Sequence, residues 1–321
     1  MKYAELLSEL NELKGSTLIS FHSLGDVEAV ASALSLAKLL KQSEVKSPDK
    51  TNSASRHLLQ NLALPTIPVV KQNELNNFDN LVLVDVANKD MLGKFGEEVA
   101  KFKGKIIAID HHEHGKMLVN ANVFEFVHRT SCCEIIYDLY RVSGKKIDPT
   151  TATLLLTGII ADTARFKTAN RQTFSAVSQL LIASGKGYGN VLSLARAVPD
   201  KSEIKNVFQA LKKVKLIETQ RGLIGVVENN AFESKTCLAL VETGCVVGIC
   251  FNPKNGKIAM AKDSENSNSA EVDVGKILKQ FGTRVNGSGG GHESVGGLTG
   301  KPELVKKAVQ KLVIEIKNTL K

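Results

Sequence analysis

Tryptophan is absent from this chain of 321 residues, and only 5% of its residues are aromatic. A broad platform for stacking the bases of long single strands is therefore not evident. No stretch has the roughly 18 consecutive apolar residues of a membrane span, and residues 1–7 lack the apolar core of a signal peptide. We expect a cytoplasmic protein without a membrane partner.

Cysteine is also scarce, with five residues of which Cys132 and Cys133 are adjacent. An odd number with two neighbours does not make a disulfide framework. Cys245 and Cys250 lie in an apolar run without a matching Cys or His pair, so we expect reduced thiols rather than a structural zinc site.

Two nucleotide-binding fingerprints are missing. No G-x-G-x-x-G follows the first predicted strand and no Walker A sequence occurs, which argues against a dinucleotide-binding Rossmann site and a P-loop. The net charge is nevertheless +9, and residues 201–321 contain 19 Lys and Arg against 12 Asp and Glu. This excess is typical of a protein that attracts an anionic substrate, although a solvated lysine-rich surface gives the same count.

The first 200 residues alternate between strand and helix patterns. Apolar runs predict buried strands at 17–22, 80–85 and 104–109, and helices are expected at 26–41 and 91–102. Such alternation is typical of an α/β fold with a doubly wound, mainly parallel sheet. Residues 131–185 then show helical patterns.

The remainder of the chain predicts a smaller α+β domain. Its expected elements are strands at 223–227, 237–241, 246–251 and 257–261, followed by helices at 274–281 and 303–320. We therefore divide the chain into a domain at 1–190, a linker helix region at 191–216 and a domain at 217–321.

The most informative motif is Asp110-His111-His112, directly after the strand at 104–109. We select five further candidate ligands in the first 200 positions, near the ends of predicted elements: His22, Asp26, Glu28, Asp85 and Asp162. Each alone is more typical of a helix cap, a turn or a structural histidine. Together they are expected to converge, because the carboxyl ends of parallel strands share one edge of a sheet.

Mixed carboxylate and imidazole ligands suit Mn²⁺, with Mg²⁺ or Co²⁺ as alternatives. The ligands suffice for two ions if one carboxylate bridges them, and two-metal sites commonly hydrolyse phosphate esters. A further motif, Gly289-Gly290-Gly291-His292, predicts a loop whose free N–H groups bind phosphate, or else a flexible surface turn.

With these motifs in this order, the chain resembles the DHH/DHHA1 phosphoesterase family over nearly its whole length. His22-x-x-x-Asp26-x-Glu28, Asp85, Asp110-His111-His112 and Asp162 resemble its four DHH motifs, and Gly289–His292 resembles the DHHA1 signature. The resemblance implies a larger N-terminal DHH domain, a smaller C-terminal DHHA1 domain and a cleft between them. The family includes nano-RNases that also dephosphorylate pAp, RecJ-like exonucleases and cyclic-dinucleotide phosphodiesterases.

The resemblance also implies roles for the individual residues. One Mn²⁺ would be held by His22, Asp26 and Asp85, and a second by Glu28, Asp85, His111 and Asp162. Asp110 would orient the site, and His112 would contact the phosphate or act as general acid. The substrate would be bound by Gly289, Gly290, Gly291, His292, Arg284 and Lys262.

Two positions depart from the family pattern. Glu28 stands where the family has aspartate, and its extra methylene changes the reach of the carboxylate. Lys262 stands near the position of a family arginine, and lysine offers a point charge in place of a bidentate fork.

The resulting hypothesis is an enzyme, a manganese-dependent phosphodiesterase or exonuclease. Its substrates would be short single-stranded RNA or DNA, cyclic dinucleotides or nucleotide bisphosphates such as pAp. A homodimer is left open. The alternatives are a pyrophosphatase or exopolyphosphatase, and a catalytically silent DHH protein that serves as a nucleic-acid-binding scaffold.

Overall fold

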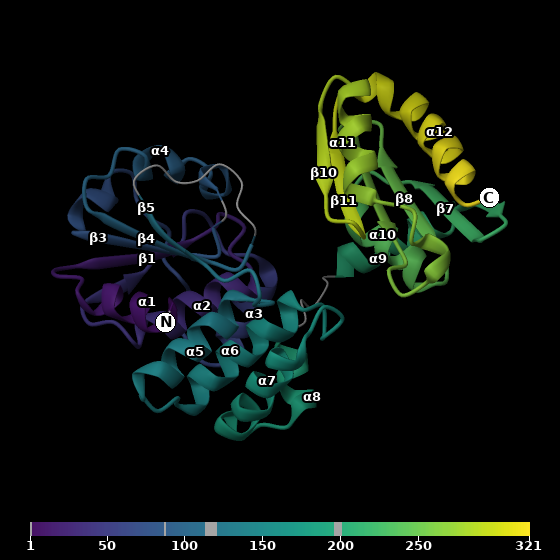
Figure 1. Ribbon diagram of the computed structural model, residues 1–321. Helices are drawn as coiled ribbons and strands as arrows, with labels where there is room; N and C mark the ends of the chain where they lie inside the picture. The colour runs from purple at the N-terminus through teal and green to yellow at the C-terminus, as the bar shows by residue number, and fades with distance from the viewer. Residues whose placement is uncertain (1, 87, 113–120, 196–200) are drawn as a thin grey trace. The chain divides into compact units, whose positions relative to one another are not determined.

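The computed structural model describes residues 2–86, 88–112, 121–195 and 201–321. The chain divides into two compact units, Met1–Val198 and Pro199–Lys321 (Figure 1). Each unit is described separately below. Residues 196–200 of the expected linker lie outside the described residues.

The first unit is built on a five-stranded sheet in the order β2-β1-β3-β4-β5, with every pair parallel. Its strands are β1 (Thr17–Phe21), β2 (Ser43–Val45), β3 (Asn80–Val84), β4 (Lys105–Asp110) and β5 (Ala121–Glu125). The sequence predicts β1, β3 and β4 but gives no signal for the short β2 or for β5. The predicted parallel sheet is confirmed.

Helices cover both faces of this sheet because its central strands are apolar on both sides. In β3, Val82 and Val84 belong to the core under α2, α5 and α6, whereas Leu81 and Leu83 belong to the opposite core with α4. The helices of this unit are α1 (Lys2–Asn11), α2 (Val27–Ala37), α3 (Ser53–Asn61), α4 (Phe95–Val99), α5 (Cys132–Ser143), α6 (Pro149–Asp162), α7 (Arg171–Ser184) and α8 (Tyr188–Ala195). Two 3-10 helices are η1 (Glu74–Asn77) and η2 (Lys89–Leu92).

The second unit has a mixed six-stranded sheet in the order β10-β11-β9-β8-β7-β6, in which only β7 and β8 are parallel. The strands are β6 (Lys215–Thr219), β7 (Gly222–Glu228), β8 (Val247–Asn252), β9 (Lys257–Lys262), β10 (Ser288–Gly291) and β11 (Val295–Thr299). Its helices are α9 (Lys201–Leu211), α10 (Glu233–Glu242), α11 (Val274–Arg284), α12 (Pro302–Thr319) and the 3-10 helix η3 (Ser267–Ser269). The predicted α+β class is confirmed.

The strand expected at 237–241 is wrong, because these residues lie in α10. Parallel strands such as β7 and β8 need a crossover connection, which is usually a helix. Cys237 and Leu240, three residues apart, lie on the buried face of this crossover. A short apolar run fits either element, and here the parallel pairing decides in favour of the helix.

The glycine run expected to form a loop is strand β10, paired with β11. A Cβ on Gly289 would lie 2.3 Å from the carbonyl oxygen of Leu278, and one on Gly291 would lie 2.4 Å from the Cα of Gly296. The run therefore allows α11 and β11 to pack directly against this strand.

A comparable close approach occurs at Gly158 in α6, where a Cβ would lie 2.2 Å from Cys133 Sγ. We expect Gly158→Val to lower the free energy of unfolding by about 1–3 kcal/mol or more, because overpacking forces the helices apart. Urea unfolding followed by circular dichroism measures this change.

Gly189→Val is the matched control, since no atom lies within 4 Å of a Cβ at that position of α8. Its unfolding free energy should change by no more than about 0.5 kcal/mol. Equal stability of the two variants would contradict the packing argument.

Candidate metal centre

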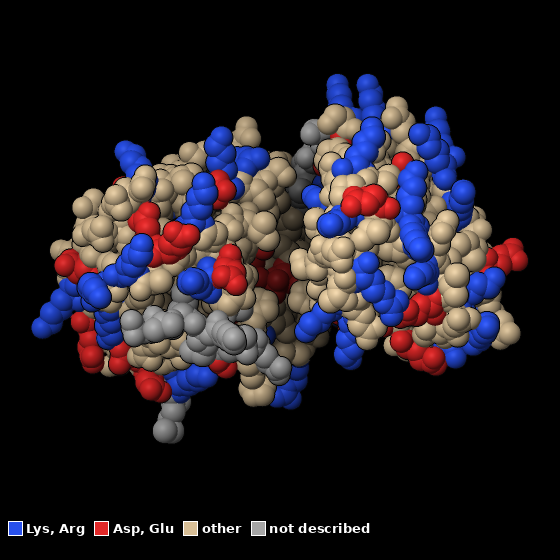
Figure 2. All heavy atoms as spheres, turned by 90° about the horizontal axis from the view of Figure 1, so that it is seen from above, with Lys and Arg blue, Asp and Glu red and all other residues tan. Residues whose placement is uncertain are grey.

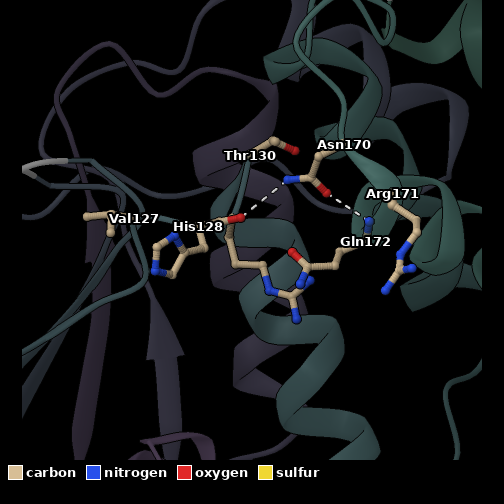
Figure 3. A pocket seen from close by; sticks show the side chains of 7 residues that line it. Val127, His128, Thr130, Asn170, Arg171 and Gln172 are labelled. Carbon is tan, nitrogen blue, oxygen red and sulfur yellow. Dashed lines mark hydrogen bonds between the residues drawn. The ribbon is translucent and has the colours of Figure 1, made fainter.

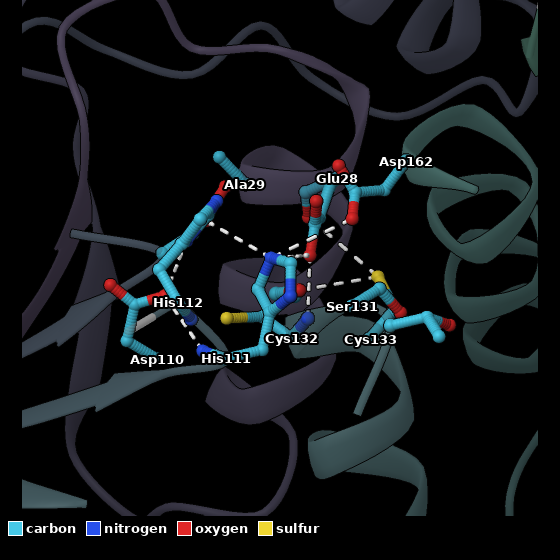
Figure 4. A network of polar contacts seen from close by, with 12 residues as sticks. Glu28, Ala29, Asp110, His111, His112, Ser131, Cys132, Cys133 and Asp162 are labelled. Carbon is cyan, nitrogen blue, oxygen red and sulfur yellow. Dashed lines mark hydrogen bonds and ion pairs between the residues drawn. The ribbon is translucent and has the colours of Figure 1, made fainter. Parts of the chain in front are cut away.

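The ligand-type side chains of the first unit converge at the carboxyl edge of the parallel sheet. His22 follows β1, Asp85 follows β3 and Asp110 ends β4. The structure brings together all eight residues that the sequence predicts here: His22, Asp26, Glu28, Asp85, Asp110, His111, His112 and Asp162. Figure 4 shows several of them directed toward one another.

Asp85 is common to three groups of side chains that could hold a metal ion. On one side, its Oδ2 lies 3.3 Å from His22 Nε2, which is 3.4 Å from Asp26 Oδ2. On the other side, its Oδ1 lies 3.9 Å from His111 Nε2. Asp85 adopts a left-handed φ of 59°, a conformation that costs a non-glycine residue about 1–3 kcal/mol and is often found at functional sites.

His111 Nε2 faces two further carboxylates. It lies 3.6 Å from Glu28 Oε1 and 3.6 Å from Asp162 Oδ2. When several ligand atoms each lie about 2.0–2.2 Å from one ion, the distances between those atoms are similar to the 3.6 Å contacts seen here. The spacing thus leaves room for an ion among these atoms.

Burial without hydrogen bonding gives a second test of fit. Among the described residues, Asp85 Oδ1 and His111 Nε2 are buried without a hydrogen-bond partner. A buried polar atom left unpaired costs about 1–3 kcal/mol. Bonds to a divalent cation would satisfy both atoms, so the residues present fit a metal.

Charge crowding points the same way. Burial, followed by the nearby charges of Asp85 and Asp162, raises the pKa of Glu28 well above its usual value. Burial also raises the pKa of Asp162. A bound cation would remove the repulsion that makes ionisation of these carboxyl groups unfavourable.

The long side chain of Glu28 carries its carboxylate to the N-terminus of α5. Its Oε1 accepts a hydrogen bond of 2.5 Å from the backbone N–H of Cys132, the first residue of α5. The carboxylate thereby bridges α2 and the positive end of α5. Sequence reasoning missed Cys132, which also belongs to a group that could bind metal. Its only sequence signal is its position after the N-cap residue Ser131.

Asp110 and His112 form a separate pair beside the centre. Asp110 Oδ1 lies 2.8 Å from His112 Nδ1 and accepts hydrogen bonds from the backbone N–H groups of His111 and His112, at 2.7 and 3.1 Å. The bond to Asp110 raises the pKa of His112 to about 9, although burial opposes this shift. Asp110 is buried and the side chain of His112 is 38% exposed, so a buried carboxylate holds an imidazole that remains open to solvent.

Carboxylates also act on the pKa of His22. Burial lowers its pKa, but the hydrogen-bonded carboxylates of Asp26 and Asp85 outweigh burial and raise the pKa to about 10. Asp26 in addition caps α2 by accepting a bond of 3.0 Å from Ala29 N–H.

In the second unit, the structure brings Lys262 close to the glycine motif. The backbone N–H of Lys262 donates to Ser294 O at 2.9 Å, and its buried ammonium donates to Glu293 Oε1 at 2.6 Å. His292 continues the same hairpin, with a bond of 2.8 Å from its N–H to Val295 O. These residues therefore share one end of the sheet.

Arg284 lies elsewhere. It ends α11, whereas Gly275 at the start of that helix packs against Gly291 and His292. At 1.5 Å per residue the two ends of α11 are about 15 Å apart. Arg284 contacts Glu315 at 3.4 Å and lies over the ring of Phe281, so the structure does not bring it together with His292 and Lys262.

Two further surface features bear on the site. A hollow of about 520 Å³ is lined by Val127, His128, Arg129, Thr130, Asn170, Arg171 and Gln172 (Figure 3). It lies at the start of α7, and none of the eight predicted ligands lines it.

Figure 2 shows many Lys and Arg side chains on the visible surface of the 199–321 unit, in keeping with its positive charge. All five cysteines are buried and free.

The chain matches the N-terminal domain of the DHH family over residues 16–159 and the DHHA1 domain over residues 241–318. It therefore belongs to the DHH/DHHA1 family. None of the described helices is long and apolar enough to cross a membrane.

Individual relatives differ in how much of them the chain covers. It is 24% identical to an uncharacterized protein of Methanocaldococcus jannaschii, over 98% of this chain and 95% of that protein. It is 25% identical to the cyclic-di-AMP phosphodiesterase GdpP of Geobacillus thermodenitrificans over 89% of this chain, but it spans only 45% of that protein.

Solved structures share the fold. An exopolyphosphatase-related protein from Bacteroides fragilis matches with a TM-score of 0.80 at 16% identity, covering 99% of this chain and 97% of the other. RecJ of Thermus thermophilus, crystallised with Mn²⁺, matches with a TM-score of 0.61 at 13% identity, covering 98% of this chain and 54% of that one.

We expect Asp85→Asn to weaken Mn²⁺ binding by more than about 100-fold, because loss of even an outer residue around a metal costs about 10–100-fold. Asparagine tolerates the left-handed φ of this position, so the fold should survive. Titration calorimetry with Mn²⁺ measures the affinity. Chelation should lower the melting temperature of the parent protein but not that of the variant.

Asp90→Asn, which alters an exposed carboxylate on η2, should leave Mn²⁺ affinity unchanged. Parent-like Mn²⁺ affinity in Asp85→Asn would contradict the shared position of Asp85 in the centre.

Proposed function

We propose that this chain is a manganese-dependent phosphodiesterase that hydrolyses short oligonucleotides, cyclic dinucleotides or nucleotide bisphosphates such as pAp. The observation that carries this proposal is the convergence of eight carboxylate and imidazole side chains around Asp85. It is supported by the DHH and DHHA1 domains and by a phosphodiesterase relative.

The proposed ligand sets follow the two sides of Asp85. His22, Asp26 and Asp85 would hold one ion, and Glu28, Asp85, His111 and Asp162 a second. When bound, such ions activate water and neutralise the phosphate. The carboxylate donors that dominate both sets suit Mn²⁺, and a RecJ of the same fold was crystallised with it.

Other side chains would donate the proton and bind the rest of the substrate. His112, kept protonated by Asp110, would donate its proton to the leaving oxygen as the phosphate ester bond breaks. Asp110 would fix the imidazole through Nδ1, so that Nε2 carries the proton toward the substrate. Lys262 and His292 of the second unit would bind phosphate or sugar groups of the substrate.

Hydrolysis of pyrophosphate or polyphosphate is the second candidate, because an exopolyphosphatase-related protein has the same fold. The DHHA1 domain at 241–318 favours nucleotide esters, because the family resemblance implies that the pyrophosphatases lack the Gly289–His292 signature. A silent scaffold is less consistent with a centre in which all eight side chains converge.

A substrate panel with Mn²⁺ tests the proposal directly. We expect cleavage of dinucleotides, cyclic di-AMP or pAp, and little or no cleavage of pyrophosphate and polyphosphate. His111→Ala should abolish the activity while retaining the circular dichroism spectrum. Cleavage of pyrophosphate alone would favour the second candidate, and activity that survives both chelation and His111→Ala would overturn the metal-dependent mechanism.

The pH dependence tests the Asp110–His112 pair. Because the pKa of His112 is raised to about 9, its proton is present below that pH and is lost above it. We expect kcat to fall as the pH rises through about 9. Asp110→Asn removes the charge that raises this pKa, so its alkaline fall should begin at lower pH.

His112→Gln serves as the reference, since it should lower kcat by about 10²–10⁴-fold and lose this alkaline fall. An unchanged pH profile in Asp110→Asn would rule out the proposed role of the pair.

A further inference from the structure

The segment after Asp162 has an unusual backbone. Ala164, Arg165 and Phe166 have φ angles of 46°, 61° and 74°, and three consecutive non-glycine residues in this region cost about 1–3 kcal/mol each. The turn is held by a bond of 2.9 Å from Arg165 N–H to Ile160 O and one of 3.1 Å from Phe166 N–H to Thr163 Oγ1. It therefore fixes the direction of Phe166 beside a candidate metal ligand.

Phe166 lies at the middle of an aromatic cluster with Phe174 and Tyr188. Its ring centroid is 5.5 Å from that of Phe174, at an interplanar angle of 48°, and 5.8 Å from that of Tyr188, at 27°. Phe166 itself packs partly on the core of the first unit. The other two rings are open to solvent, with Phe174 53% and Tyr188 38% exposed.

This exposure is exceptional for the chain. Trp is absent, and only 12 Phe and 4 Tyr are present. Phe174, Phe208 and Tyr188 are the aromatic side chains among the exposed large hydrophobics of the described residues. Two of these three rings, Phe174 and Tyr188, therefore gather around Phe166. Phe166 itself is four residues beyond Asp162, a carboxylate of the metal centre. Core packing does not explain side chains that remain this exposed.

Positive charge accompanies the rings. Arg165 is exposed within the strained turn, and Arg171 is exposed at the start of α7. Arg171 and Phe174 are three residues apart, so they are neighbours on the surface of that helix. Arg171 also lines the hollow of about 520 Å³ (Figure 3). A ligand with a flat ring and phosphate groups matches this combination.

We propose that Phe166, Phe174 and Tyr188 form a stacking platform for a nucleobase of the substrate whose phosphate lies at the metal centre. The inference rests on the proposed function and narrows it. Base–aromatic stacking is tolerant of base identity because every base has a π-face. The platform therefore selects substrates that carry a base over pyrophosphate or polyphosphate, without choosing among the bases.

Paired kinetics test the platform. Phe174→Ala in the full chain with Mn²⁺ is assayed on a dinucleotide and on the same sugar–phosphate backbone without bases. We expect the ratio of kcat/KM for the dinucleotide to that for the abasic compound to fall about 5- to 100-fold, mainly through KM. Phe174→Tyr, which keeps a ring, should restore the ratio.

Ile182→Ala is the matched control, because Ile182 is 74% exposed on the same helix and lies eight residues from Phe174. Its ratio should equal that of the parent. A ratio that is unchanged in Phe174→Ala, or that falls equally in both variants, overturns the platform. A change in oligomeric state of Phe174→Ala without a change in the ratio would identify the cluster as a protein contact and also overturn it.

A binding assay separates this inference from the proposed function. Because the chain lacks Trp, Phe174→Trp and Ile182→Trp each carry a single tryptophan, which is excited selectively over the four Tyr. A dinucleotide added without metal should quench Phe174→Trp but not Ile182→Trp, and pyrophosphate should quench neither. If the parent cleaves no phosphodiester but this quenching occurs, the proposed function fails while base binding stands; cleavage without quenching reverses that conclusion.

Discussion

Repulsion among buried carboxylates is the constraint on which the centre depends. Glu28, Asp85 and Asp110 are buried, and Asp162 lies beside them within reach of His111. A cluster of buried negative charges is unfavourable unless positive charges lie between them. The imidazole of His112 supplies part of this positive charge. The unpaired atoms Asp85 Oδ1 and His111 Nε2 mark where a metal ion would supply the rest. The metal ions of the proposed reaction would supply this positive charge.

The parallel sheet is what concentrates the charges. Because β1, β3 and β4 run in the same direction, their carboxyl ends place His22, Asp85 and Asp110 at one edge. The helices then complete the set from above this edge, with Glu28 in the first turn of α2 and Asp162 at the end of α6. Strain at Asp85 and after Asp162 occurs where the backbone must leave regular structure to direct these groups inward.

Much of this was predictable from sequence because the signals were local and strong. Continuous apolar runs that lead into Asp or His indicated β3 and β4 together with the candidate metal ligands at their ends. The order of the motifs along the chain indicated the other candidate ligands. Short or polar segments such as β2 and β5 gave no comparable signal. Cys132 could not be predicted, because its role depends on a contact with Glu28, which is distant in the sequence. The aromatic cluster could not be predicted, because its role depends on the solvent exposure of its rings. The helix at α10 was missed because pairing between distant strands, rather than local pattern, decides its conformation.

The glycine hairpin of the second unit has a consequence for how sequences of this kind can diverge. A side chain at Gly289, Gly291 or Gly296 would meet backbone atoms at 2.3–2.5 Å, whereas nothing lies within 4 Å of a Cβ at Gly290. Within β10 the run therefore contains one position that is sterically free between two that are not. A substitution at Gly290 can change the chemistry of the hairpin surface without disturbing the packing of α11. The ligand preference of the domain can therefore change while its fold is kept.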